Sequence, residues 1–120
     1  MKSIAEIDSY YKLITQLDSL LSDITDLSKK SPNDGLNKFK LKFVNQLLET
    51  ANSILPIQSR PFADFKKFSE EDIPTNSDVV MIISQYVGCL ARYKSKNIQK
   101  DPRGYKMKWI VNGKMIDREA

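Results

Sequence analysis

Apolar residues recur every three or four positions along most of the chain, which is the spacing of one face of an α-helix. Ser3, followed by Glu6 three residues later, has the form of a capping box. It precedes a periodic apolar run of Ile4, Ile7, Tyr11, Ile14, Leu17, Leu21 and Ile24. This pattern predicts a long amphipathic helix over about residues 3–28, ended by Lys29, Lys30 and a Pro-Asn-Asp-Gly turn.

Three further helices are predicted downstream. A second run, over residues 36–55, places on its buried side Leu36, Phe39, Phe43, Val44, Leu47, Leu48, Ala51, Ile54 and Leu55. Pro61 can open a short helix over residues 61–68, whose i, i+3 spacing aligns Phe62, Phe65 and Phe68. Thr75 or Ser77 can cap a helix over residues 76–96.

The periodicity changes near the C-terminus, where Asn112-Gly113 supplies the two positive φ angles of a type I′ turn. A two-stranded β-hairpin is therefore predicted over residues 105–119. The turn fixes a register whose expected pairs are Ile110 with Met115, Lys108 with Asp117, Lys106 with Glu119, Trp109 with Ile116 and Met107 with Arg118. Since an isolated hairpin is marginal in water, the face carrying Tyr105, Met107, Trp109, Val111 and Ile116 is expected to pack on the helices or on another subunit.

The predicted fold is one α+β domain over residues 1–120, predominantly α-helical. It consists of a small helical bundle, with three main helices and one short helix, followed by the C-terminal two-stranded β-hairpin. A chain of 120 residues is the usual size of a single domain.

The composition excludes more chemistry than it suggests. The chain has no histidine, so histidine-based triads, His-containing zinc sites and histidine general bases are ruled out. Its one cysteine, Cys89, cannot form an intrachain disulfide and is expected to be a small buried hydrophobe. No secretory signal is visible and the longest apolar run, Val79 to Ile83, is far short of a membrane span. We therefore expect a cytoplasmic protein with no membrane partner and no cofactor.

Positive charge is concentrated in the C-terminal part of the chain. Between residues 92 and 108, seven basic residues stand against Asp101 alone. Cations with interleaved aromatic rings are typical of a nucleic-acid surface, which here would use Arg92, Lys94, Lys96, Lys100, Arg103, Tyr105, Lys106 and Lys108. The structural alternative is that the helical cations compensate the helix dipole, while Lys106 and Lys108 pair across the hairpin with Glu119 and Asp117.

The first helix carries a wider apolar stripe than packing on one neighbour needs, and part of the stripe follows a heptad spacing. This indicates a contact surface for a second copy or a protein partner, formed by Tyr10, Leu13, Leu17, Leu20 and Ile24. The alternative is that the stripe packs inside an intrachain bundle.

Other candidate sites have weaker signals. Glu70, Glu71, Asp72 and Asp78 form an acidic cluster that could bind a metal or act in catalysis, with a solvated loop and a helix cap as the alternative. Tyr86 and the three phenylalanines could line a small-ligand pocket, with core packing as the alternative. No phosphate-binding glycine loop or Cys-x-x-Cys pair is present.

The sequence therefore predicts a small non-catalytic interaction or accessory protein that forms a homodimer or binds a larger protein partner. The alternative is a nucleic-acid-binding module that uses residues 92–108. A small-ligand protein ranks third, and an enzyme last.

Overall fold

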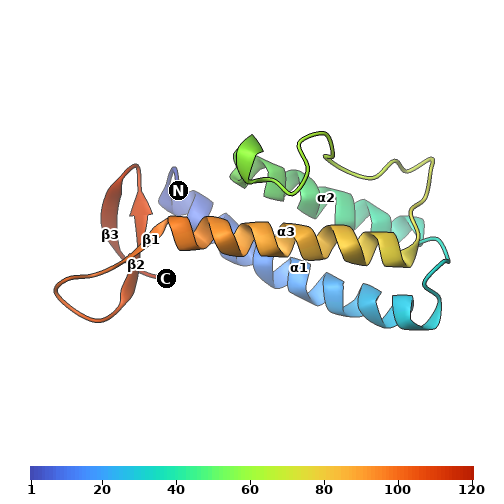
Figure 1. Ribbon diagram of the computed structural model, residues 1–120, viewed down its shortest axis with the longest axis horizontal. Helices are drawn as coiled ribbons and strands as arrows, with labels where there is room; N and C mark the ends of the chain where they lie inside the picture. The colour runs from blue at the N-terminus through green and yellow to red at the C-terminus, as the bar shows by residue number, and fades with distance from the viewer.

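The computed structural model describes all residues, 1–120, and has the predicted mostly helical α+β architecture. Three α-helices run side by side, and an antiparallel sheet lies at one end of the bundle (Figure 1). The molecule is elongated, with principal extents of 52 × 26 × 19 Å. The elements are α1 (Ile4–Lys30), α2 (Lys38–Ile54), the 3₁₀ helix η1 (Ile57–Ser59), α3 (Asn76–Lys96), β1 (Ile98–Lys100), β2 (Met107–Val111) and β3 (Lys114–Glu119).

Side-chain caps define where the three α-helices begin. The Ser3 hydroxyl accepts a hydrogen bond from the Glu6 amide at 3.1 Å, as the capping-box pattern predicts for the start of α1. Thr75 accepts from the Asp78 amide at 3.2 Å, and α3 spans the predicted residues. The second helix starts at Lys38 rather than Leu36, because Asn37 is its N-cap.

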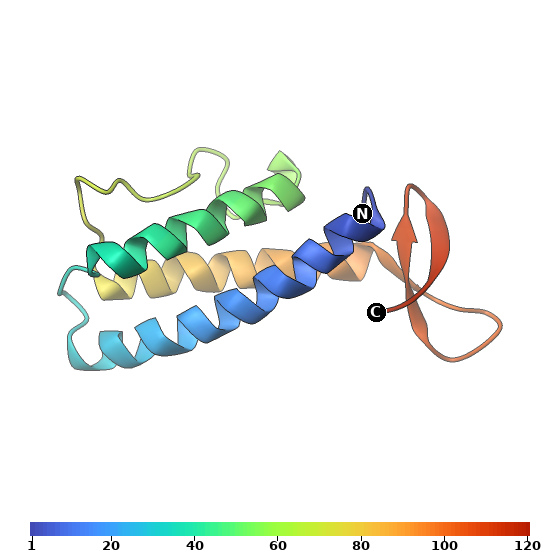
Figure 2. The same ribbon diagram turned by 180° about the vertical axis from the view of Figure 1, so that it is seen from behind.

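The core lies where the three helices meet. It contains Leu13 and Leu17 of α1, Leu48 of α2, and Ile83 and Leu90 of α3, all inaccessible or nearly so. α1 runs along α3 and also alongside α2, as the view from behind shows (Figure 2). Burial of these apolar side chains is the main force that holds the bundle together.

The chain enters and leaves α2 through a narrow neck. Gly35 and Thr75 form an isolated antiparallel bridge, and the Leu36 amide donates to the Pro74 carbonyl at 3.0 Å. Residues 36–74, which contain α2, therefore leave the pair formed by α1 and α3 and return to it at the same place.

The predicted short helix over residues 61–68 is wrong. That segment is irregular and follows the three-residue η1. Asparagine side chains of α2 bind its backbone: Asn45 accepts from the Phe68 amide and donates to the Phe68 carbonyl, both at 2.9 Å, and Asn52 donates to the Lys66 carbonyl at 3.0 Å. These tertiary hydrogen bonds satisfy backbone groups that a helix would have paired within itself.

The hairpin is confirmed, but it belongs to a three-stranded sheet of order β1-β2-β3. Asn112 and Gly113 have φ angles of 51° and 78°, as a type I′ turn requires. The pair Ile110 with Met115 is as predicted. An irregularity between Lys108 and Ile110 then shifts the register, so the backbone pairs predicted beyond it are wrong and Lys108 lies opposite Glu119 instead of Asp117. The predicted ion pairs of Lys108 with Asp117 and of Lys106 with Glu119 nevertheless form between the side chains.

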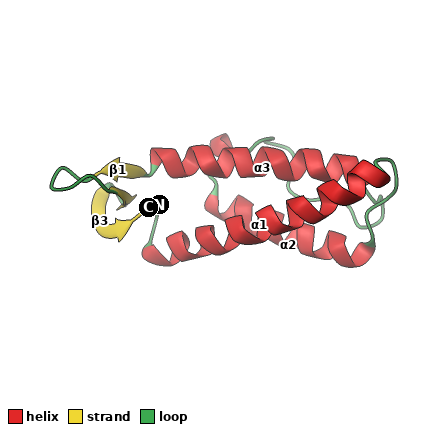
Figure 3. Ribbon diagram, turned by 90° about the horizontal axis from the view of Figure 1, so that it is seen from below, coloured by secondary structure: helices red, strands yellow, loops and turns green.

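Trp109 attaches the sheet to the helices. Its side chain is fully buried, and its indole N–H donates to the Tyr11 hydroxyl at 3.0 Å. The rings of Tyr10 and Tyr11 meet it edge to face, with centroids 5.6 and 5.8 Å away. The expected packing of this sheet face on the helices is found for Trp109, Val111 and Ile116, whereas Met107 and Tyr105 of the same predicted face are exposed. Seen from below, the sheet lies beyond the end of α3, next to both chain ends (Figure 3).

Candidate functional site

The structure places most of the predicted contact stripe of α1 inside the chain's own core. Tyr10, Leu13, Leu17 and Ile24 are buried, and the Tyr10 hydroxyl donates to the Leu90 carbonyl of α3 at 3.1 Å. Leu20 alone of the five remains partly accessible. The heptad spacing therefore reflects packing of α1 within the bundle, and a partner contact on α1 has to use neighbouring residues.

A groove between α1 and α2 leaves apolar surface open. Its volume is about 620 Å³, and its apolar lining consists of Leu20, Phe43 and Leu47. Phe39 lies one turn before Phe43, and the two rings meet edge to face with centroids 5.0 Å apart. The prediction that the two phenylalanines lie on the buried side of α2 is wrong, because Phe39 is 71% and Phe43 41% exposed. We call Leu20, Phe39, Phe43 and Leu47 the α1–α2 face.

The two ends of this groove carry opposite charges. Lys12 and Asp23 line it and are eleven positions apart on α1, which is about three helical turns and about 16 Å. Thr15, Gln16 and Ser19 line the stretch between them. The groove thus has a positive charge near one end and a negative charge near the other. A twofold rotation would bring the positive end of one copy opposite the negative end of a second copy.

The predicted basic segment is partly neutralised within the chain. Lys108 bridges Asp117 and Asp101 at 2.7 and 3.0 Å, and its side chain is only 16% exposed. Arg103 pairs with Asp101 at 3.4 Å, and Lys106 lies 3.5 Å from Glu119. Three of the seven cations proposed to bind phosphates are thus already paired with carboxylates.

These ion pairs shift the pKa values of the groups involved. A hydrogen bond from the Arg103 amide, supported by Lys108, lowers the pKa of Asp101 to about 2. Hydrogen bonds to Asp117 and Asp101 raise the pKa of Lys108, and the same contact lowers the pKa of Asp117. All three groups are therefore held in their charged forms at neutral pH.

The other predicted nucleic-acid residues are dispersed over three regions. Lys94 lies over the Tyr11 and Trp109 rings, 5.3 and 5.7 Å from their centroids, and so stabilises the junction between bundle and sheet. Lys100 lies 5.2 Å from the centroid of Tyr105, which is 92% exposed on the loop between β1 and β2. Arg92 and Lys96 belong to a different place, a cleft on the side of α3.

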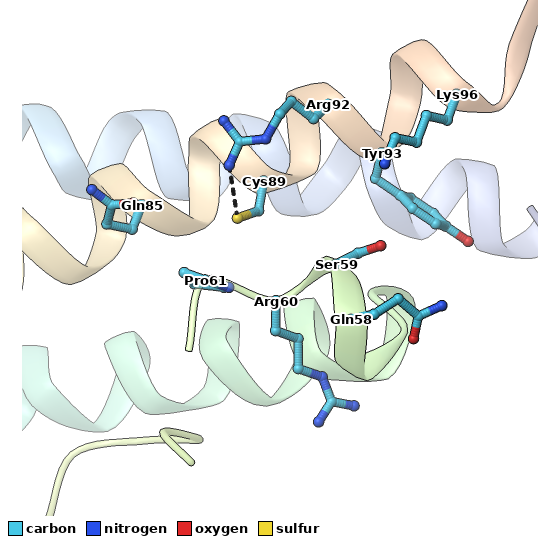
Figure 4. Close-up of a pocket in the computed structure, with 9 residues that line it drawn as sticks. All are labelled: Gln58, Ser59, Arg60, Pro61, Gln85, Cys89, Arg92, Tyr93 and Lys96. Carbon is cyan, nitrogen blue, oxygen red and sulfur yellow. Dashed lines mark hydrogen bonds between the residues drawn. The ribbon is translucent and has the colours of Figure 1, made fainter. Parts of the chain in front are cut away.

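This cleft lies between α3 and η1 and has a volume of about 190 Å³ (Figure 4). Sequence analysis missed it, because it joins residues of η1 to residues of α3 that are some thirty positions away. It is lined by Gln58, Ser59, Arg60, Pro61, Gln85, Cys89, Arg92, Tyr93 and Lys96. Cys89 forms part of its floor and, as expected, is nearly inaccessible.

Hydrogen bonds within the chain hold the side chains of two cleft residues. Arg92 donates to the Cys89 sulfur at 3.2 Å, whereas Arg60 turns away from the cleft and donates to the carbonyls of Asn52 and Leu55 at the end of α2 (Figure 4). Burial raises the pKa of Tyr93, so its hydroxyl stays protonated at neutral pH.

The remaining candidates offer no convergent chemistry. Glu70, Glu71 and Asp72 are exposed in the irregular segment, Asp78 lies in the first turn of α3, and no group of three or more potential metal ligands is found. Tyr86 is buried and donates to the Asn52 side chain at 2.8 Å, as a core residue with a satisfied hydroxyl does. None of the α-helices combines the length and the apolar composition that crossing a membrane requires.

The fold thus defines a small, mostly helical α+β domain, a three-helix bundle extended at one end by an antiparallel sheet. No protein-family model, curated protein or solved structure shows significant similarity to this chain. Its function has to be argued from its own surfaces.

Proposed function

We propose that this protein is a small non-catalytic interaction module that forms a homodimer through the α1–α2 face. The observation that carries the proposal is an open groove lined by Leu20, Phe43 and Leu47, next to which the exposed ring of Phe39 packs on Phe43. Contiguous exposed apolar surface of this kind is typical of protein contact sites, and aromatic residues are enriched there.

The charge pattern of the groove favours a second copy as the partner. In a twofold dimer, if residue i of one copy contacts residue j of the other, then residue j of the first copy also contacts residue i of the second. An axis between Gln16 and Ser19 makes the two α1 helices antiparallel, so that Lys12 of each copy faces Asp23 of the other. Exposed ion pairs of this kind contribute only about 0.2–1 kcal/mol each, so they set the orientation while the apolar residues supply the affinity.

Sedimentation velocity of the intact chain, at about 5 to 100 µM, tests this proposal across the range where weak dimers appear. We expect the wild type to shift towards twice the monomer mass as concentration rises. Phe43→Glu places a charge in the contact and should leave a folded monomer. Phe62→Glu is the matched control, since Phe62 is 39% exposed against 41% for Phe43 but lies outside the groove. A wild type that stays monomeric throughout would refute the dimer.

Charge reversal tests the orientation. Lys12→Asp or Asp23→Lys alone would place like charges opposite one another twice, which should weaken the dimer by about five- to thirty-fold for a loss of about 1–2 kcal/mol. The double reversal restores both pairs and should restore dimerisation. If the double variant is as weak as the singles, the twofold arrangement is wrong even where the dimer itself exists.

A second candidate function is nucleic-acid binding through the loop between β1 and β2. It is favoured by Tyr105, whose ring is almost fully exposed and has the Lys100 ammonium over it, a pairing suited to stacking an unpaired base beside a phosphate. Fluorescence anisotropy with single-stranded DNA and RNA, at about 50 and 200 mM salt, should show binding that weakens with salt and with Tyr105→Ala. Flat titrations at both salt concentrations would exclude this function.

A further inference from the structure

We propose that the cleft between α3 and η1 binds a small ligand through a phosphoryl group. The inference stands independently of the dimer, because it rests on Arg92, Lys96 and the polar side chains around them, none of which lies in the α1–α2 face (Figure 4).

The charged residues that line the cleft are all positive. None of its nine lining residues is acidic, and neither Arg92 nor Lys96 takes part in an ion pair. Lys108, by contrast, is paired with Asp101 and Asp117. Two cations one turn apart on α3, facing a hollow without carboxylates, favour an anionic ligand.

The hydrogen-bonding capacity of the cleft is also largely unused. The hydrogen bond that Arg92 makes goes to a thiol sulfur, which is a weak acceptor, so most of its guanidinium donors remain available. Ser59 and Tyr93 also line the cleft, and the hydroxyl of Ser59 has no hydrogen-bond partner within the chain. In the close-up Ser59 of η1 lies across the cleft from α3, the Arg92 guanidinium lies on the Gln85 side, and the Tyr93 hydroxyl points to the opposite end (Figure 4). A tetrahedral oxyanion presents several acceptor oxygens, which could bind the free donors of Arg92, Lys96 and Ser59.

Size and charge narrow the ligand class. A cleft of about 190 Å³ is smaller than the range of about 300–1,000 Å³ usual for drug-sized ligands and cofactors. Two unpaired cations match the charge of about −1.5 to −2 that a phosphate monoester carries at neutral pH, and exceed that of a single carboxylate. We therefore assign the cleft to inorganic phosphate or to the phosphoryl group of a small molecule.

Isothermal titration calorimetry of the intact chain with inorganic phosphate, at constant ionic strength, tests the assignment. Arg92→Gln should weaken binding by at least about tenfold, as expected for the loss of charge-assisted hydrogen bonds. Lys96→Gln should weaken it less. Lys30→Gln is the matched control, because Lys30 ends α1 as Lys96 ends α3 and its loss removes the same charge. Acetate should bind more weakly than phosphate.

Cys89 provides a second readout, since it is the single cysteine and its sulfur accepts from Arg92. Saturating phosphate should slow alkylation of Cys89 by iodoacetamide several-fold in the wild type and in Lys30→Gln, but not in Arg92→Gln. A small phosphorylated molecule such as glycerol phosphate is tested in parallel, and tighter binding than phosphate would identify an esterified ligand. No heat and no protection of Cys89 with either ligand would overturn the proposal, as would equal losses in Arg92→Gln and Lys30→Gln. Either outcome would mean that Arg92 and Lys96 only compensate the dipole at the C-terminal end of α3.

Discussion

Replacement of Trp109 by alanine tests how the sheet is held on the helical bundle. The indole is fully buried between Tyr10 and Tyr11, and it is the largest fully buried side chain. Its loss removes the apolar contact of the ring, the two edge-to-face contacts and the hydrogen bond to the Tyr11 hydroxyl.

The magnitude follows from these contacts. Truncation of a buried tryptophan or phenylalanine to alanine costs about 3–5 kcal/mol. A domain of this size has a total stability of about 5–15 kcal/mol, and each kcal/mol lost lowers the melting temperature by about 3–5 °C. We therefore expect Trp109→Ala to melt roughly 10–20 °C lower than the wild type. Trp109→Phe keeps most of the ring contact but loses the indole N–H, so it should cost about 1–2 kcal/mol.

Urea unfolding followed by far-ultraviolet circular dichroism is the appropriate assay, because fluorescence disappears with the single tryptophan. Tyr11→Phe and the double variant Trp109→Phe with Tyr11→Phe complete a double-mutant cycle. The cycle should give a coupling of about 1 kcal/mol for the hydrogen bond. A coupling near zero would show that this hydrogen bond contributes nothing. A Trp109→Ala variant as stable as the wild type would refute the docking of the sheet.

Three further predictions concern single contacts. Gly113→Val should lower stability by about 1–2 kcal/mol in urea unfolding, since φ at Gly113 is +78° and a β-branched residue is strained there. The fold lowers the pKa of Asp101 from 3.8 to about 2, so the contribution of this carboxylate to the stability of the fold is complete above about pH 4 and is lost as the pH falls through about 2. Over this pH range, the midpoint of urea unfolding should therefore fall less in Asp101→Asn than in the wild type. Asn45→Ala should cost about 2–3 kcal/mol and accelerate hydrogen exchange at the Phe68 amide, because both backbone groups of Phe68 lose their partner.

Local signals in the sequence predicted the elements whose ends are set locally. The third α-helix starts at the Thr75 cap and spans the predicted residues, and the Asn112-Gly113 turn adopts the predicted backbone conformation. Segments whose conformation depends on distant partners were missed. The three-residue β1 is too short to show an alternating pattern, and it forms a strand because β2 lies next to it. Residues 61–68 were predicted as a helix but are irregular, because Asn45 of α2 binds their backbone at Phe68.

The candidate sites were predicted less well than the fold, for a related reason. Periodicity identifies Leu17 as apolar on one face of α1 but does not distinguish an intrachain neighbour from a partner, and Leu17 lies in the core. Phe43 fits the same apolar periodicity, yet it is exposed because no element covers that side of α2. The cleft beside Arg92 depends on the return of η1 to α3, a tertiary contact without a sequence motif.

The neck at Gly35 and Thr75 has a consequence for how the molecule opens. Residues 36–74 begin and end at this bridge. α2 and the segment after it can therefore detach together while α1 and α3 remain packed on each other. Such a unit is expected to exchange its amide hydrogens through a partial opening of lower free energy than global unfolding, whereas the amides of α3 exchange only when the whole domain unfolds. The molecule would then behave as two cooperative units within one domain, a stable unit made of α1, α3 and the sheet, and a separable unit that contains α2.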